Sequence, residues 1–170
     1  IYDYGVTAVG SAVTHILTVT NTGGAIASSL ADTGGLAAPY RYLGGAYPGT
    51  GGDCNTNLGP GATCQLVVEF APVVANIFSD TVELSYNDGL AAQTISRDLQ
   101  GTGAVPANLT ITESDPYDLG TIPTGGTLTH TFTLTNTGGF TASTINDVGL
   151  AAPFEFLGGT FPGAGGDCTA

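Results

Sequence analysis

Two histidines are the residues of this chain whose side chains could act as a general base or bind a metal. His15 and His130 occupy equivalent positions of an internal repeat, each preceded by a threonine in a segment that alternates apolar and polar residues. A Ser-His-Asp mechanism would need the same triad in both copies, and no Gly-x-Ser-x-Gly turn accompanies either histidine. We therefore expect inward-facing histidines near strand ends with backbone partners, and no catalytic residues.

Three cysteines are the other residues that could react or bind metal. Their spacing, and that of the histidines, differs from the close ligand pairs of structural zinc sites. Cys54 and Cys64 flank a short segment of Gly, Pro, Asn and Thr, which favours a disulfide that closes a loop in an oxidising, extracytoplasmic compartment. Cys168 corresponds to Cys54 in the repeat, so we expect its partner beyond Ala170; a reactive or intermolecular thiol is the alternative.

Acidic residues gather loosely around positions 101–107, where carboxylate oxygens could hold calcium and stiffen a joint between domains. A dense Asp-x-Asp pattern is missing, so solvated strand ends are the competing interpretation. The calcium candidates are Asp98, Glu113, Asp115 and Asp118. No other cofactor is expected.

Aromatic residues accompany two glycine-rich stretches. These stretches lack the Gly-Lys-Ser/Thr ending of a phosphate-binding loop and are expected to be turns. Their aromatic residues could form a strip that stacks on sugars or contacts a protein, or they could pack into the core and the loops. The residues of this contact strip are Tyr40, Tyr42, Tyr47, Phe154, Phe156 and Phe161.

The charge of the chain excludes several partners. Its formal net charge is −12, and Arg41 and Arg97 are its only basic residues apart from histidine. Nucleic acid and anionic lipid would be repelled. No apolar run approaches the roughly 20 residues that span a bilayer, so no membrane insertion is expected within these residues. We expect any signal or anchor outside them, and an extracellular or cell-surface location.

The sequence repeats itself with a period of about 115 residues. Asp3-Tyr4-Gly5 falls on Asp118-Leu119-Gly120, and Asn21-Thr22-Gly23-Gly24 falls on Asn136-Thr137-Gly138-Gly139. Such a period is the size of one domain rather than of a solenoid unit. The predicted domains are residues 1–103 and 108–170, joined by a linker at 104–107. The first copy lacks an opening strand, whose counterpart is 108–114, and the second stops after the Cys168 loop.

Alternating patterns predict half-buried strands. Leu66, Val68 and Phe70 share one parity, as do Val82, Leu84 and Tyr86, and residues 13–19 and 128–135 alternate in the same way. Turn sequences separate these segments, and no stretch has a convincing helical period. The predicted fold class is all-β, with tandem immunoglobulin-like antiparallel β-sandwich domains. Arg97 shares parity with Ile95 and Leu99, so we expect a bulge or an edge position there.

These motifs together resemble one family. They are the Asp3-Tyr4-Gly5 opening, the strand ending in Asn21-Thr22-Gly23, the run from Leu58 to Cys64, the segment Val68-Glu69-Phe70-Ala71-Pro72 and the closing Leu99-Gln100-Gly101-Thr102-Gly103. The chain is similar to bacterial choice-of-anchor D repeats, which are related to the immunoglobulin-like domains of abnormal-spindle and hydin proteins. The resemblance implies a sandwich module of large secreted or surface-anchored proteins, without catalytic residues.

The leading hypothesis for function is a non-enzymatic structural module of an extracellular fibre, stalk or filament whose partners are other copies or neighbouring repeats. A second hypothesis is an adhesion module that binds glycan or protein through loops at one end, and a third is an accessory domain beside an enzyme. A sandwich without its first strand also has an open edge that a strand of another copy could fill. The candidate strand-exchange segment is Asn108, Leu109, Thr110, Ile111, Thr112, Glu113 and Ser114.

Overall fold

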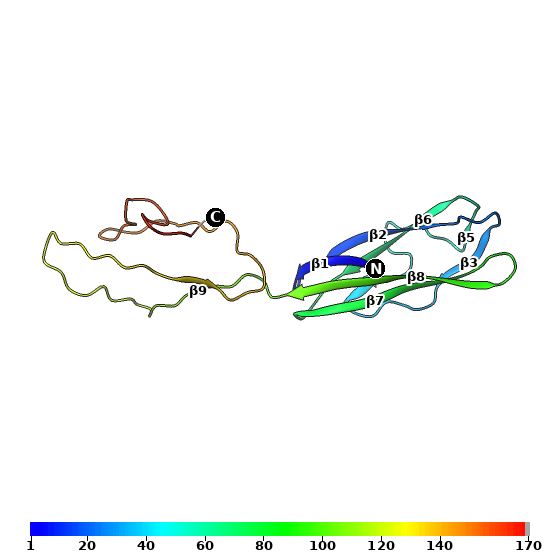
Figure 1. Cartoon of the computed structure of the whole chain (residues 1–170), viewed down its shortest axis with the longest axis horizontal. Coiled ribbons are helices and arrows are strands. Elements are labelled where there is room, and N and C mark those ends of the chain that lie inside the picture. Colours follow the sequence, from blue (N-terminus) through cyan, green and yellow to red (C-terminus); the bar gives the residue numbers. More distant parts are fainter. Residues whose placement is uncertain (169–170) are drawn as a thin grey trace. The chain divides into compact units, whose positions relative to one another are not determined.

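A computed structural model describes residues 1–168 of the chain and divides it into two compact units, Ile1–Val105 and Pro106–Ala170. The predicted linker spans this division, and each unit is described by itself below. No helix occurs among the described residues, so none of them forms a helix that could cross a membrane. Unit 1 contains eight strands (Figure 1): β1 (Tyr2–Ala8), β2 (Val13–Thr20), β3 (Ala27–Asp32), β4 (Tyr40–Tyr42), β5 (Asn57–Leu58), β6 (Thr63–Phe70), β7 (Asn76–Asn87) and β8 (Ala92–Ala104).

Unit 1 is a β-sandwich of two sheets. The larger sheet has the strand order β1-β8-β7-β3-β5, and the smaller has the order β2-β6-β4. The long β7–β8 hairpin pairs without interruption from Asn76 opposite Gly103 to Asn87 opposite Ala92. The predicted all-β sandwich is confirmed for this unit.

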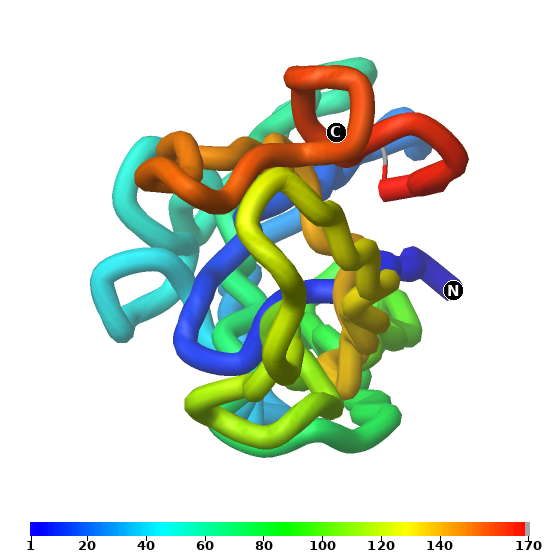
Figure 2. The backbone as a smooth tube through the Cα atoms, turned by 90° about the vertical axis from the view of Figure 1, so that its left-hand side faces the viewer, coloured from blue at the N-terminus to red at the C-terminus, as the bar shows by residue number. Residues whose placement is uncertain are grey.

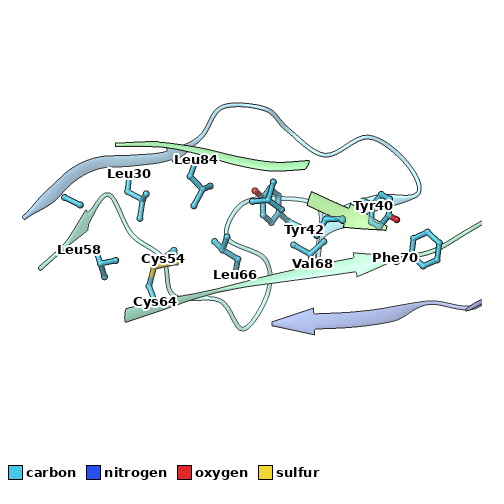
Figure 3. Packing of buried hydrophobic residues seen from close by; sticks show 13 residues of the cluster. Leu30, Tyr40, Tyr42, Cys54, Leu58, Cys64, Leu66, Val68, Phe70 and Leu84 are labelled. Carbon is cyan, nitrogen blue, oxygen red and sulfur yellow. A yellow bond between two sulfur atoms is a disulfide. The ribbon is translucent and has the colours of Figure 1, made fainter. Parts of the chain in front are cut away.

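The core of unit 1 lies between the two sheets. Figure 3 shows side chains of the larger sheet, such as Leu30 and Leu84, pointing toward Leu66 and Val68 of the smaller sheet. The predicted inward residues Leu66, Val68, Phe70, Val82 and Leu84 are buried, whereas Tyr86 is half-buried. In β6 the intervening Val67 and Glu69 are buried as well, so the expected alternation is incomplete there. The alternating pattern follows from the strand geometry, in which successive side chains point to opposite faces.

One strand pair departs from the antiparallel prediction. β1 runs parallel to β8, with Tyr2 opposite Leu99 and Ala8 opposite Ala104, and the register shifts between Asp3 and Val6. At the shift, Gly5 has a φ of 71° and its N–H donates to the Asp3 carboxylate. The two strands lie at opposite ends of the unit in sequence, so no hairpin turn dictates their relative direction.

Of the two positions expected for Arg97, a bulge or a sheet edge, the structure has the edge. Residues 92–98 of β8 pair with β7 on one side and extend beyond β1, whose pairing begins at Leu99. Pairing with β7 is continuous through Arg97, so no bulge occurs there. Leu99 is fully buried, whereas Ile95 and Arg97 are exposed although they share its parity.

Unit 2 forms one two-stranded antiparallel sheet from β9 (Leu109–Ile111) and β10 (Leu134–Asn136). Only the end of the strand predicted at residues 128–135 is therefore present. In unit 1 the equivalent strand β2 pairs with β6, and residues 106–168 contain no counterpart of β6 to complete that ladder. Residues 138–168, orange to red in Figures 1 and 2, run as loops and turns.

Candidate functional site

The predicted disulfide is present. Cys54 and Cys64 are bonded and both are buried, at the end of the core shown in Figure 3. Two hydrogen bonds hold the loop beside β6: Asp53 N–H donates to the Gln65 carbonyl, and Gln65 N–H donates to the Asp53 side-chain carboxylate. Closing this loop stabilises unit 1 by about 2–3 kcal/mol through restriction of the unfolded chain. Cys168 has no disulfide partner among residues 1–168.

The contact strip is not an exposed surface at Tyr40 and Tyr42, because both rings belong to the core. Tyr40 stacks on Phe70 with ring centroids 4.9 Å apart. The Tyr40 hydroxyl donates to the Phe78 carbonyl at 3.1 Å, and the Tyr42 hydroxyl donates to the Asp32 carboxylate at 3.0 Å. The alternative interpretation, core packing, therefore applies to these two residues.

Burial sets the ionisation of these hydroxyls. It raises the pKa of Tyr40 to about 12, with the carboxylates of Asp80 and Asp3 adding to the effect. Burial also raises the pKa of Tyr42, and the neighbouring Asp32 raises it further. Both hydroxyls are therefore neutral hydrogen-bond donors, and neither is poised as a nucleophile or base.

The third tyrosine of the strip, Tyr47, packs edge-on against Tyr42 with ring centroids 5.5 Å apart. Its buried hydroxyl has no hydrogen-bond partner among the residues that the structure describes. In unit 2 the equivalent residues Phe156 and Phe161 keep the same arrangement at 5.6 Å and 86°, without hydroxyls. The ring positions therefore depend on packing rather than on the Tyr47 hydroxyl.

The glycine-rich loop that carries these rings has one backbone geometry in both units. In unit 1 the N–H of Gly45 donates to the Tyr42 carbonyl and that of Thr50 donates to the Leu43 carbonyl, at 2.8 and 2.6 Å. In unit 2 the corresponding bonds, from Gly159 to Phe156 and from Ala164 to Leu157, are 2.7 and 2.6 Å. The loop conformation is thus a local property of the repeated sequence.

The histidines have tyrosine partners rather than the expected backbone partners. His15 stacks on Tyr2 with ring centroids 3.6 Å apart, and burial lowers its pKa. His130 stacks on Tyr117 at 4.2 Å, and its Nδ1 lies 2.9 Å from the Tyr117 hydroxyl. The same His–Tyr pair at equivalent positions in both units indicates a structural role.

The acidic candidates do not converge on a calcium site. Asp98 belongs to unit 1, where it accepts a hydrogen bond from the Thr81 hydroxyl, and the other three belong to unit 2. Glu113 accepts a hydrogen bond from Thr133 N–H. Within residues 1–168 no group of three or more His, Cys, Asp or Glu side chains could hold a metal ion. Asp115 and Asp118 lie in the same unit as Glu113.

Hydrogen bonds and a nearby histidine define the charge state of Glu113. Its desolvation raises the pKa, but hydrogen bonds from its own backbone and from Thr133 N–H, together with His130, outweigh that effect and lower it. The Glu113 Oε1 lies 3.8 Å from His130 Nε2. Glu113 is therefore an anion held beside an imidazole within unit 2.

The most distinctive surface of unit 1 is its open side. β2 pairs with β6 alone, and residues 92–98 of β8 have no strand on the side away from β7. A cavity of about 420 Å³ lies between these two edges. Its apolar walls come from both sheets and include Leu17, Val19, Leu66, Val82, Leu84 and Ile95.

A second cavity, of about 380 Å³, continues this opening toward the turn after β2 and shares Val19, Thr20 and Ile95 with the first. We call the two cavities together the open groove. His15 and Arg97 line its other end. The parity that Ile95 and Arg97 share with Leu99 was the sequence signal at this groove, and it marks the part of β8 that extends beyond β1. The lining residues of β7 could not be assigned to the groove from sequence.

The strand-exchange segment of unit 2 is partly a strand in the structure. β9 pairs antiparallel with β10, with Ile111 opposite Leu134 and Leu109 opposite Asn136. Leu109 and Ile111 are nevertheless 41% and 59% exposed, so this pairing does not bury their side chains.

Comparisons with known proteins found solved structures that resemble part of this chain. No known family profile and no curated protein matches this sequence. The chain is similar to part of the Vibrio cholerae VesB protease, with a TM-score of 0.50 and 17% identity over 59% of this chain and 29% of the protease. An ASH/PapD-like domain of human CEP192 (PapD-like domain 7) has a TM-score of 0.42 and 13% identity, over 61% of this chain and 81% of that domain. The chain thus spans less than a third of VesB, and the likeness concerns the fold alone.

Proposed function

We propose that this chain is a non-enzymatic structural repeat module of a long secreted or surface-displayed bacterial protein that forms a fibre, stalk or filament. The observation that carries the proposal is the recurrence of one glycine-rich loop, with matching hydrogen bonds, in units 1 and 2. Repetition at a domain-sized period is typical of arrays in which each module has its own core. A recurring scaffold, rather than a recurring reactive group, is what the two copies share.

The potential catalytic residues support a structural role. Both histidines stack on tyrosines, and the hydroxyls of Tyr40 and Tyr42 donate to neighbouring oxygens. The disulfide supports an oxidising compartment, where such bonds persist. Only 9% of the residues of the chain are charged, and most of these are acidic, which suits an extracellular scaffold with few charged groups.

The adhesion hypothesis is less well supported. It relied on an exposed aromatic strip, and Tyr40 and Tyr42 of that strip are buried in the core of unit 1. Phe154 in unit 2 remains exposed, so a glycan array is the appropriate check of that alternative.

Electron microscopy of the native material tests the proposal. We expect regular threads or filaments with a repeat of one domain length, and a mobility shift between reducing and non-reducing gels from the disulfide. The purified chain should bind no glycan on an array. Isolated globular particles that bind a defined glycan would replace the structural role with adhesion.

A further inference from the structure

The first and last strands of unit 1, β1 and β8, lie side by side and run in the same direction (Figure 1). Tyr2 is opposite Leu99 at the start of this ladder, and Ala8 is opposite Ala104 at its end. β1 has no other strand partner within residues 1–168, whereas β8 also pairs with β7 along almost all of its length. The two ends of unit 1 are therefore joined by one parallel strand pair.

A pull on the two ends of unit 1 loads this strand pair along its length. The chain enters β1 at Tyr2 and leaves β8 at Ala104, and these two positions lie at opposite ends of the ladder. Because the strands are parallel, the two pulls act along the strand axis in opposite directions, and β1 can leave β8 only by sliding. The hydrogen bonds of a parallel pair are evenly spaced along it, so sliding strains them together. Strands that are peeled apart from one end lose their bonds one after another.

We propose that β1 and β8 form a mechanical clamp through which unit 1 resists tension along the chain. The longer ladder to β7 holds β8 on its other side, so the ladder between β1 and β8 is the first to yield. Resistance to force is governed by the rate of unfolding rather than by the free energy of unfolding. The clamp goes beyond the proposed function, because it belongs to unit 1 whether or not the parent protein forms a filament.

The register of the clamp defines the direction of its backbone groups. Val9 N–H donates to the Ala104 carbonyl at 2.9 Å, directly after the last paired residues. Since the direction alternates along a strand, Thr7 also directs its N–H and C=O groups toward β8, and Ala8 directs its N–H away from β8. Thr7 and Ala8 are therefore adjacent residues of which only one contributes an N–H to the ladder.

Side chains also tie β1 to the core of unit 1. Thr7 is buried, and the hydroxyl of Tyr4 donates to the Val68 carbonyl of the smaller sheet at 3.2 Å. The Tyr4 ring lies against Tyr40 and Phe70, with ring centroids 5.7 Å apart in both pairs. Sliding of β1 along β8 must pull this ring out of its contacts. Resistance to sliding therefore combines the backbone ladder with an aromatic side chain packed on the core.

Single-molecule force spectroscopy of the full chain tests the clamp by changing where the chain is held. In the first geometry the handles are attached to the two termini, which loads β1 and β8 as described. In the second, the N-terminal handle is moved to Ser11→Cys, with Cys168→Ser in both chains to leave no other free thiol. Ser11 is exposed and follows the end of β1 that lies beside Ala104, so this pull peels unit 1 open from one end.

We expect unit 1 to unfold at least roughly tenfold faster at one fixed force in the second geometry, which is the effect of about one ladder hydrogen bond on the barrier. The disulfide identifies the step that belongs to unit 1. It withholds the residues between Cys54 and Cys64, which are 10 positions apart, from extension. Reduction should therefore lengthen this step by roughly 30 Å. Equal unfolding rates in the two geometries would overturn the proposal.

Two proline variants provide a matched control in the first geometry. Thr7→Pro removes an N–H that faces β8, whereas Ala8→Pro removes one that faces away, which an edge strand tolerates. We expect Thr7→Pro to unfold roughly tenfold faster at a fixed force and Ala8→Pro to resemble the wild type. Circular dichroism melts show whether both chains are folded, and the two pulling geometries test the clamp even if Thr7→Pro does not fold.

The outcome for the clamp is separate from the outcome for the proposed function. A folded Thr7→Pro chain that unfolds at the wild-type rate would overturn the clamp. Regular filaments seen by electron microscopy alongside that result would leave the structural role intact. Faster unfolding of Thr7→Pro, together with wild-type behaviour of Ala8→Pro, would support the clamp even in a protein that forms no filament.

Discussion

At the scale of single residues, two neighbouring tyrosines of unit 1 differ in the hydrogen bonding of their hydroxyls. Tyr42 has a carboxylate partner in Asp32, whereas the hydroxyl of Tyr47 is buried without one among the described residues. A buried polar group without a partner costs free energy, but the ring around it still contributes packing. The second copy of the repeat has phenylalanine at both positions, Phe156 and Phe161.

We expect Tyr47→Phe to leave the free energy of unfolding unchanged or to raise it by about 1 kcal/mol, because it removes an unsatisfied hydroxyl. The matched variant Tyr42→Phe should lower it by about 1.5 kcal/mol, because the hydrogen bond to Asp32 is lost. Urea unfolding of both variants measures the difference. Equal losses in the two variants would show that the Tyr47 hydroxyl has a partner after all.

His15 should make the stability of unit 1 depend on pH. Burial lowers its folded-state pKa below the ordinary value of 6.5, so the unfolded chain takes up the proton more readily. The contribution of neutral His15 to the free energy of unfolding is therefore complete above pH 6.5, and it is lost as the pH decreases below that value. Carboxylates titrate at lower pH.

The measurement is the melting temperature of unit 1 at about pH 7.5 and about pH 5.5, which bracket the titration of histidine. The wild-type protein should melt lower at the acidic pH, and His15→Gln should lose most of that difference. His130→Gln, in unit 2, is the control and should keep it. Identical pH profiles for the wild type and His15→Gln would contradict the assignment.

At the scale of elements, the smaller sheet has two unlike edges. Beyond β4, the glycine-rich loop covers β6, since Leu43 N–H donates to the Val67 carbonyl and Val67 N–H donates to the Pro48 carbonyl, both at 2.9 Å. At the other edge, β2 exposes the backbone N–H and C=O groups of Thr18 and Thr20, which point away from β6. The loop thus acts as the missing continuation of β4, and only the β2 side remains available for another strand.

Two glycines of this loop have the same conformation but different surroundings, so they form a matched pair. Gly45 and Gly49 have φ values of 89° and 92°, and a methyl group at Gly45 would enter open space. We expect Gly45→Ala to destabilise unit 1 by about 1–2 kcal/mol from the left-handed backbone alone. Gly49→Ala should cost clearly more, because its methyl group would collide with the Val67 carbonyl. Thermal unfolding compares them, and equal losses would show that the loop can move away from β6.

At the scale of the whole chain, the two units differ in how they bury their apolar residues. Unit 1 encloses Tyr40, Phe70 and Leu99 between its sheets. In unit 2, Tyr117, Phe132 and Phe154 are exposed beside one short pair of strands. Local opening is easiest where few apolar contacts are buried, so the two units should differ in resistance to proteases.

Limited digestion with chymotrypsin, which cleaves after aromatic residues, should therefore begin in unit 2. We expect early cuts after Tyr117, Phe132 and Phe154 and a persistent fragment that retains residues 1–105 and the disulfide. Mass spectrometry of the digest identifies the cuts, and digestion in urea with reductant is the control in which unit 1 is also cleaved. Early cleavage after Tyr40 or Phe70 would contradict the difference between the units.

The sequence by itself determined the features that depend on neighbouring residues. Alternation identified the inward faces of β6 and β7, the spacing of Cys54 and Cys64 indicated their disulfide, and the parity of Arg97 pointed to an edge. Side-chain direction in a strand and closure of a short loop are local properties. They can therefore be inferred without knowing which strands pair.

Only the tertiary structure decided the features that depend on residues distant in sequence. It placed β1 parallel to β8, buried Tyr40 and Tyr42 rather than exposing them, and left the strand predicted at residues 128–135 mostly unformed. It also located the open groove between β2 and β8. Strand partners and the burial of loop aromatics are set by the contacts of the complete sandwich, and the periodicity of a single segment carries no information about them.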